Sequence, residues 1–340
     1  MSFPAIRKVA VVGVGAIGGI FAGWLGSRLD PGAVDLSVLA RGKTLATLQM
    51  QGLTWVDAHG ADHHVAHSVL HCSDSAVELG PQDLVIVSVK APSIPLVAQQ
   101  LCPLLREHTA VLIAMNGVPW WFFDGLPGTN SGLELQSVDP GGLTRAALPT
   151  RHVLGCVVHA TASVPRYGRI ESIKNNQLIL GEPSGGISAR AQAVARLLED
   201  AGFAVKVSER IQEDIWFKLW GNMTMNPVSA LTRAPCDHIL DDPLVRSFCS
   251  AVMLEAQAIG EHIGCAIHQS PEDRHAITRA MGSFKTSMLQ DVEAGRPIEL
   301  DALVGVVREI AQHIGLATPN IDALLGLTRL MGRSQQLYPQ

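Results

Sequence analysis

The chain has 340 residues, of which 47% are hydrophobic and 17% charged. A chain of this length usually forms two domains, and this composition is typical of a compact globular protein rather than a disordered or fibrous one. The formal net charge of −5 gives no general attraction to nucleic acid or to a membrane surface, so neither is expected as a partner. Six scattered cysteines without a CxxC pair fit small core residues of a cytoplasmic protein better than a disulfide framework.

The N-terminal segment has two interpretations. Arg7 and Lys8 precede an apolar run over residues 9–26, which could pass for a signal peptide. Six glycines interrupt that run, and they suit a strand, a tight turn and a closely packed helix instead. We therefore expect this segment to belong to the folded protein.

The first 209 residues alternate short β-rich runs with helical stretches. Strands are expected over residues 9–12, 35–39, 84–89 and 110–114, with the runs 152–160 and 177–180 extending the sheet. A helix over 188–201 should end at Gly202, where glycine easily forms a left-handed cap. This alternation predicts an α/β domain with a parallel, doubly wound sheet.

From residue 210 the pattern is almost entirely helical, with helices expected over 211–225, 243–263, 271–293 and 301–313. We interpret residues 210–331 as an all-α C-terminal domain that binds the substrate. A homodimer through this small apolar domain is a hypothesis. The polar tail from Gly332 is expected to be loose.

A glycine-rich turn follows the first strand. Residues 9–18 read VAVVGVGAIG, a strand that runs into GxGxxG at the start of a helix. Gly13 would allow the tight turn, Gly15 would let a pyrophosphate approach the backbone, and Gly18 would allow close packing of the helix. Ala16 and Ile17 would be the first residues of that helix, whose N-terminus faces the phosphates. This context predicts a Rossmann domain that binds a dinucleotide, over residues 1–209.

The end of the second strand distinguishes the two nicotinamide cofactors. A carboxylate there would bind the ribose hydroxyls of NAD, but the sequence has Arg41 and Lys43 instead. Two cations favour the 2′-phosphate of NADPH. The alternative is that both are ordinary solvated charges.

A polar stripe marks the start of the C-terminal domain. Lys218, Asn222 and Asn226 are spaced i, i+4, i+8 among apolar neighbours, so a helix would place them on one face. A cleft that holds a polar ligand would satisfy all three, whereas the alternative is a solvated helix face. Reduction of a ketone needs a proton donor for the oxygen, and a lysine in a partly dry cleft donates its proton more readily than one in water.

These motifs together resemble the ketopantoate reductases. The family carries a lysine and two asparagines at this spacing, and other matching positions follow in the same order along nearly the whole chain. They are the GxGxxG turn, Lys90 in SVKA, Asn116-Gly117, and TSMLQD over 286–291 followed by RPIELD over 296–301.

The resemblance implies an NADPH-dependent reduction of 2-dehydropantoate, or a similar 2-oxo acid, in a cleft between the two domains. It implies that Lys218 is the general acid and that Glu299 sets its charge and holds the substrate. Asn222, Asn226 and Ser287 would bind the substrate, while Lys90 and Asn116 would lie beside the nicotinamide ribose. Without the resemblance, Glu299 would be read as a solvated or capping residue, and Ser287 as a surface serine.

The sequence departs from the family after Asn116. Four consecutive aromatics, residues 120–123, precede a glycine- and proline-rich stretch to about 150, where family members are shorter. The aromatics would either reshape or cover the substrate pocket, or pack between the domains. The segment around Cys236 also lacks the polar substrate ligand that some members have there.

Histidines at 59, 63, 67 and 71 recur every four residues, as a metal stripe on a helix would. The same spacing shares a face on a strand, and we expect exposed edge strands and no metal site. Two other functions stay open for the whole chain. One is a hydroxy-acid or opine-type dehydrogenase, and the other is a non-catalytic NADPH sensor.

Overall fold

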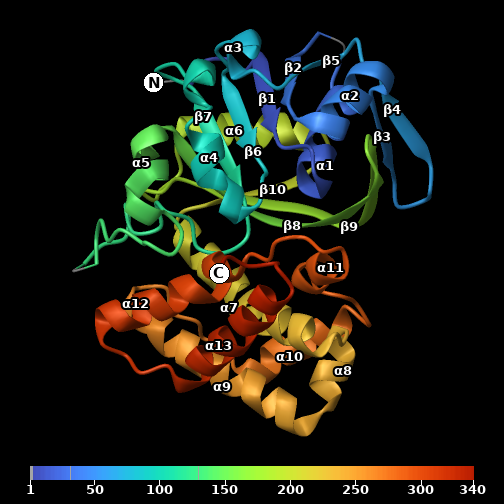
Figure 1. The fold of residues 1–340 in the computed structure, drawn as a ribbon. Helices are drawn as coiled ribbons and strands as arrows, with labels where there is room; N and C mark the ends of the chain where they lie inside the picture. The colour runs from blue at the N-terminus through green and yellow to red at the C-terminus, as the bar shows by residue number, and fades with distance from the viewer. Residues whose placement is uncertain (1–2, 31, 129) are drawn as a thin grey trace. The chain divides into compact units, whose positions relative to one another are not determined.

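The computed structural model describes residues 3–30, 32–128 and 130–340, without the side chains of 172–174. The chain divides into two compact units (Figure 1). The first, the nucleotide unit, comprises Met1–Met115 and Gly142–Ile211, and the second, the helical unit, comprises Asn116–Gly141 and Gln212–Gln340. The sequence predicts a single boundary near residue 209, whereas this division also assigns 116–141 to the helical unit.

The nucleotide unit is built on a ten-stranded sheet in the order β4-β3-β9-β8-β7-β6-β1-β2-β5, with β10 paired to β9. Most neighbours are parallel; β3 with β4 and β8 with β9 are antiparallel. The strands are β1 (Lys8–Val12), β2 (Asp35–Leu39), β3 (Leu53–Val56), β4 (Asp62–Val65), β5 (Leu70–Ser73), β6 (Leu84–Val87), β7 (Ala110–Ala114), β8 (Val153–Arg166), β9 (Arg169–Gly181) and β10 (Ala204–Ser208). The expected α/β class is confirmed, as a mixed sheet that is mainly parallel.

Parallel strands β1, β6 and β7 consist of apolar residues apart from exposed Lys8 at the start of β1, because both faces of the sheet are covered. These apolar residues are almost fully buried. The unit's α-helices are α1 (Ala16–Arg28), α2 (Gly42–Gln51), α3 (Ala76–Leu79), α4 (Ile94–Ala98), α5 (Leu143–Ala147) and α6 (Ala189–Asp200). Short 3₁₀ turns lie at 91–93, 102–104, 140–142 and 150–152.

Helix α1 lies unusually close to the sheet because one of its faces consists of glycines. A Cβ at Gly19 would stand 2.3 Å from Ile170, one at Gly23 2.8 Å from Trp55, and one at Gly26 2.7 Å from Val65. Any side chain at these three positions would push the helix away from β9, β3 and β4. The glycines that interrupt the apolar run of residues 9–26 therefore set the helix-to-sheet distance.

The helical unit consists of α7 (Ile211–Thr232), α8 (Cys236–Asp241), α9 (Pro243–His262), α10 (Pro271–Ala280), α11 (Ser287–Glu293), the π-helical turn η5 (Asp301–Gly305), α12 (Val306–Ile314) and α13 (Pro319–Ser334). Helix α9 contacts α8, α10, α12 and α13. It also contacts α7, because Trp220 Nε1 donates a hydrogen bond to the Met253 carbonyl at 2.8 Å.

Two expectations for this unit were wrong. The helix expected over 271–293 is two helices, separated at Gly282, whose φ of 76° ends α10. The tail from Gly332 is not loose. Helix α13 continues to Ser334, and the Leu337 carbonyl then accepts a hydrogen bond from the Ile298 amide at 3.0 Å.

The aromatic segment 120–123 belongs to the core of the helical unit. Its four side chains are at most 2% exposed, and the Phe122 ring lies 6.1 Å from that of Trp216 on α7. The Glu309 carboxylate on α12 accepts hydrogen bonds from the amides of Gln136 and Ser137 further along the segment. These contacts are those of core packing within the helical unit rather than of a lid.

The four periodic histidines do not converge. His59 lies in a loop, His63 on β4 and His71 on β5, and β4 and β5 are the opposite edges of the sheet. His63 stacks on Trp55 with ring centroids 4.0 Å apart and hydrogen-bonds Asp57. Within the described ranges, no three His, Cys, Asp or Glu side chains are grouped to hold a metal ion.

Candidate active site

The glycine-rich turn joins β1 to α1 with the geometry expected for a phosphate-binding loop. Gly13 has a φ of 85°, which favours glycine, and a Cβ at Gly18 would stand 1.9 Å from the Gly13 carbonyl oxygen. No atom lies within 4 Å of a Cβ built on Gly15, so the backbone there is open to a ligand. Ser88, at the end of β6, holds the turn by donating to the Gly13 carbonyl at 2.7 Å.

The first turn of α1, which begins at Ala16 and Ile17, has no side-chain cap and no acidic residue. Its amide groups and the positive end of the helix dipole are therefore available to an anion. Together with the open backbone at Gly15, this turn fits a pyrophosphate.

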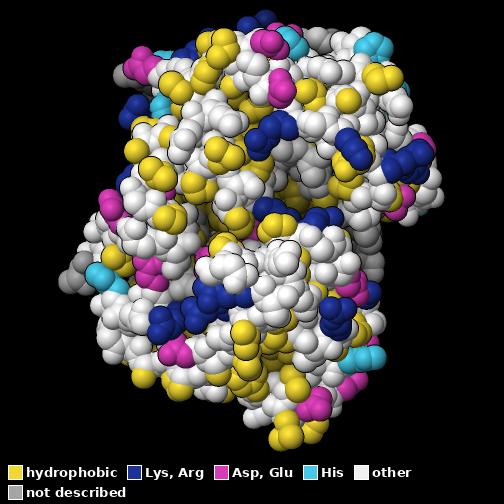
Figure 2. Space-filling model, viewed as in Figure 1, with side chains coloured by type: hydrophobic (Ala, Val, Ile, Leu, Met, Phe, Trp, Pro, Cys, Tyr) yellow, Lys and Arg dark blue, Asp and Glu magenta, His cyan; other side chains and the backbone are white. Residues whose placement is uncertain are grey.

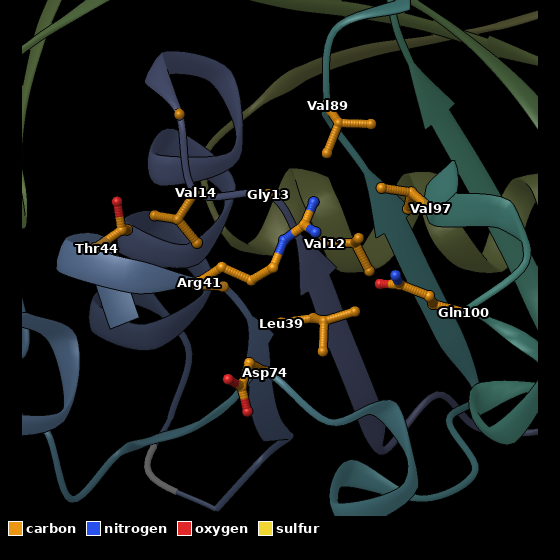
Figure 3. A pocket seen from close by; sticks show the side chains of 12 residues that line it. Val12, Gly13, Val14, Leu39, Arg41, Thr44, Asp74, Val89, Val97 and Gln100 are labelled. Carbon is orange, nitrogen blue, oxygen red and sulfur yellow. The ribbon is translucent and has the colours of Figure 1, made fainter. Parts of the chain in front are cut away.

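A cavity of about 270 Å³ opens beside this turn (Figure 3). It lies at the carboxyl ends of β1, β2 and β6, where open α/β sheets bind ligands. Figure 3 shows the Arg41 side chain running toward Gly13, with Val97 and Gln100 on another side of the pocket. The lining residues are Val12, Gly13, Val14, Gly15, Leu39, Ala40, Arg41, Thr44, Asp74, Val89, Val97 and Gln100.

The structure separates the two cations predicted for the cofactor. Both are exposed, but Arg41 lines the cavity and precedes the N-terminus of α2, whereas Lys43 is not a lining residue. Lys90, also predicted, is half-buried at the start of the turn 91–93, next to the lining residue Val89. All three belong to the nucleotide unit.

Sequence reasoning missed Thr44, Asp74, Val97 and Gln100. Asp74 directly follows β5, an edge strand of four residues that carries no alternating pattern. Predicting that strand would have placed Asp74 at the same sheet edge as Arg41, because parallel neighbours end together.

In the helical unit, the polar stripe lies on α7 as predicted. Its three residues are surrounded by buried Trp216, Leu219, Trp220 and Met223, each at most 2% exposed. Lys218 and Asn222 are half-buried, and Asn226 is 6% exposed. This burial excludes a simple solvated helix face.

Lys218 is held by Asn116, a residue 102 positions earlier in the chain. The ammonium Nζ donates a hydrogen bond to Asn116 Oδ1 at 2.7 Å. The family resemblance implies that Asn116 lies at the cofactor end of the site. In the structure it belongs to the helical unit and bonds the predicted general acid. The neutral amide orients the ammonium without adding a second charge.

Asn116 is positioned by the residue that follows it. Gly117 has a φ of 87°, and a Cβ there would stand 2.2 Å from the Ala302 carbonyl oxygen in η5. The Val118 amide donates to the same oxygen at 2.9 Å. Glu299, which is half-buried, lies three residues before Ala302, so the segment that bears Glu299 is adjacent to the Asn116 turn.

The remaining predicted residues meet at the far end of the stripe. Asn226 Nδ2 donates to the Ser287 hydroxyl over a long 3.4 Å, where exposed Ser287 begins α11. One polar stripe thus carries a proton donor at Lys218, an amide at Asn222 and an amide–hydroxyl pair at Asn226 and Ser287. Such a set suits a ligand with a carbonyl and several oxygen acceptors.

The face shown in Figure 2 has several small separate groups of Lys and Arg side chains and no continuous basic field. Of the helices that the structure describes, none has both the length and the apolar character that a membrane span requires.

Known proteins resemble this chain along its whole length. Residues 9–119 match the family model for ketopantoate reductase PanE/ApbA, and residues 210–332 match the model for the C-terminal domain of the same family. The 2-dehydropantoate 2-reductase of Mesorhizobium japonicum is 39% identical over 97% of this chain and 99% of its own.

Solved structures share the fold. A candidate ketopantoate reductase from Ralstonia solanacearum is 52% identical, with a TM-score of 0.92 over 98% of this chain and 100% of its own. D-mandelate dehydrogenase, solved with NADH and anilino(oxo)acetate, is 19% identical with a TM-score of 0.81 over 97% of this chain and 100% of its own, a likeness of fold alone.

Proposed function

The chain belongs to the ketopantoate reductase family, and from this premise we propose that it reduces 2-dehydropantoate, or a 2-oxo acid of similar size, to the 2-hydroxy acid with NADPH. This reaction would serve pantothenate biosynthesis. The observation that carries the proposal is the 2.7 Å hydrogen bond from the Lys218 ammonium to Asn116, on a stripe of otherwise neutral polar side chains.

Lys218 is the general acid of the proposed reaction. NADPH supplies the hydride to the keto carbon, and the keto oxygen then needs a proton as it gains negative charge. The ammonium first stabilises that charge and then donates the proton. Asn116 keeps the ammonium oriented. Glu299, on the segment adjacent to the Asn116 turn, is the proposed carboxylate that keeps Lys218 in its charged form.

Asn222, Asn226 and Ser287 bind the hydroxyl and carboxylate oxygens of the substrate in this proposal. Their support is their common stripe and the Asn226–Ser287 contact. Each offers a donor and an acceptor, so each can bind an oxygen in either state of protonation.

NADPH fits the nucleotide unit through the uncapped turn of α1 and through Arg41. A cation at the end of β2 suits the 2′-phosphate, whereas Asp74 at the end of β5 suits a hydrogen-bond donor of the adenosine. We extend the proposal to a cytoplasmic location and a homodimer. All six cysteines are thiols in the structure, which agrees with a reducing compartment.

The proposal is tested by steady-state kinetics of the purified protein. We expect NADPH oxidation with 2-dehydropantoate or with one member of a panel of branched 2-oxo acids, independent of added amine. Amine dependence would indicate an opine-type dehydrogenase instead. Absence of NADPH oxidation with the entire panel would refute the reductase function.

Replacement of Lys218 by Ala tests the acid. We expect kcat to fall by about 10²- to 10⁴-fold, the usual contribution of a general acid, while the dissociation constant for NADPH measured by fluorescence stays the same. Lys206→Ala, at an exposed position of β10, is the control and should leave kcat unchanged. Unchanged turnover in Lys218→Ala contradicts the assignment.

A further inference from the structure

Arg274, on α10, lies against the helix that carries the polar stripe. Its guanidinium Cζ is 5.3 Å from the ring centroid of Phe217, the residue before Lys218. Nη2, Nε and Cζ lie 2.5, 2.6 and 2.9 Å from the position that a Cβ on Gly221 would occupy. The guanidinium therefore occupies the space that a side chain at position 221 of α7 would fill. This position lies one turn after Lys218 and next to Asn222.

Gly221 has no other role that the structure shows. A glycine inside a helix is less favourable than alanine by about 1 kcal/mol, so its presence there needs a steric reason. Here the reason is Arg274, because any side chain at 221 would displace the guanidinium. Residues three apart on a helix have Cβ atoms about 5–6 Å apart, which puts the guanidinium within roughly 8 Å of the base of Lys218.

No counter-charge for this cation is found among the described residues. Over the residues that the structure describes, no carboxylate forms an ion pair with Arg274 and no acceptor bonds its side chain, and its Nε is buried without a partner. Burial lowers the pKa of the guanidinium from its usual value. The residue as a whole is only half-buried, so its terminal amino groups stay within reach of a ligand.

The proposed substrate has a matching unpaired charge. A 2-oxo acid carries a carboxylate, and Lys218 is assigned to its keto oxygen. Asn222, Asn226 and Ser287, which the proposed function places against its hydroxyl and carboxylate oxygens, are neutral and leave the negative charge without a cation. A guanidinium binds a carboxylate through two parallel hydrogen bonds, which no neutral amide can reproduce.

We propose that Arg274 binds the carboxylate of the 2-oxo acid together with the neutral side chains of the stripe, and so restricts the enzyme to anionic substrates. The inference deepens the proposed function and rests on it. The guanidinium is packed on Phe217 and over Gly221 of α7 before the substrate arrives, which limits the side-chain freedom that two-point binding would otherwise have to remove.

The test measures binding, so that it does not depend on turnover. Pantoate, a 2-hydroxy acid, and its primary amide are titrated calorimetrically into protein saturated with NADP⁺. The wild type should bind the acid more tightly than the amide. Arg274→Met, which keeps the packing on Phe217, should weaken binding of the acid about 10- to 100-fold and leave the amide nearly unchanged.

Two further variants complete the experiment. Arg274→Lys keeps the positive charge but cannot form two parallel hydrogen bonds to a carboxylate, so it should retain part of the preference for the acid. Arg279→Met is the matched control on α10, because Arg279 already pairs with Asp241 at 2.7 Å, and it should bind both ligands as the wild type does.

The role of Arg274 would be overturned if Arg274→Met lost affinity for the acid and for the amide equally. It would also be overturned if the wild type bound the two ligands with the same affinity. A wild type that prefers the acid but oxidises no NADPH with any 2-oxo acid would instead refute the reductase function alone.

Discussion

Arg41 and Lys43 are two cations from one predicted motif, and the structure gives them different environments. Arg41 lines the nucleotide cavity, and Lys43 is exposed outside the lining. We expect Arg41→Ala to raise KM for NADPH by about 10- to 100-fold, because a charge-assisted hydrogen bond to the 2′-phosphate is lost.

KM for NADH should change little in Arg41→Ala, since NADH lacks that phosphate. Lys43→Ala is the control, and both of its KM values should stay near those of the wild type. An equal rise for NADPH in the two variants would show that general surface charge, rather than Arg41, selects the cofactor.

His275 is the buried histidine of α10, with no exposed surface. Among the described residues, neither of its ring nitrogens has a hydrogen-bond partner. Burial lowers its pKa from 6.5, and nearby Arg246 and Arg279 act in the same direction, while Glu272, 3.5 Å away, opposes them. Below about pH 6.5, His275 binds a proton in the unfolded chain but stays neutral in the folded chain. Stability therefore falls as the pH decreases, until folded His275 is protonated too.

The expected slope for His275 is at most about 1.4 kcal/mol per pH unit. Urea unfolding of His275→Leu between pH 5 and 7 should show a flatter dependence than the wild type. His262→Leu, at an exposed position of α9, should keep the wild-type slope. Parallel curves for all three proteins would contradict the assignment.

At the scale of elements, the C-terminal tail fastens the segment that bears Glu299. The Leu337 carbonyl accepts from the Ile298 amide, and the Tyr338 hydroxyl donates to Asp301 Oδ1 at 2.7 Å. Burial raises the pKa of the Asp301 carboxyl, and the Tyr338 hydroxyl acts against this rise. Tail contacts thus lie on both sides of Glu299.

Tyr338→Phe should lower stability by about 1.5–3 kcal/mol, because Asp301 loses a hydrogen bond to a charged acceptor, and kcat should fall as the Glu299 segment loosens. Thermal unfolding and steady-state kinetics measure the two effects. Tyr167→Phe, at a residue 54% exposed, changes the other tyrosine and should leave both quantities unaltered.

Elements with strong patterns could be predicted, and those defined by distant contacts could not. β1, β2 and β7 match their predicted ranges within a residue because buried parallel strands consist mostly of apolar residues. Strands β3, β4 and β5, of which β4 and β5 are edge strands, have four residues each, too few to show a clear alternation of apolar and polar residues. The ordered tail was missed because Tyr338 depends on Asp301, a partner 37 residues away.

The candidate site shows the same limit. The stripe 218, 222, 226 follows from helical periodicity alone, and the family resemblance supplied Asn116, Ser287 and Glu299. Neither approach indicated Arg274, because its site is formed by the absence of a side chain at Gly221.

At the scale of the whole molecule, the helical unit is discontinuous in sequence. Residues 116–141 contribute Asn116 and the buried aromatics, and the rest of the unit begins at residue 212. A fragment of residues 210–340 therefore lacks the partners of Trp216 and Lys218. We expect it to expose apolar surface and to unfold without a cooperative transition.

Circular dichroism during heating, with dye binding to exposed apolar surface, measures this outcome. The full chain carrying Phe122→Ala is the companion experiment and should lose about 3–5 kcal/mol, the usual effect of truncating a buried phenylalanine. A fragment 210–340 that unfolds cooperatively would show that segment 116–141 is dispensable to the unit.

The glycine face of α1 has a consequence for the affinity of the nucleotide. The amides expected to hold the pyrophosphate start this helix, and its other end is seated on Val65 through Gly26. A methyl group added at Gly26 would tilt the helix and shift those amides, although residue 26 touches no part of the cavity. A random-mutagenesis screen for weaker or altered use of the coenzyme should therefore recover substitutions two and three turns after the start of α1. These positions do not contact the ligand, so a map of ligand contacts would not select them.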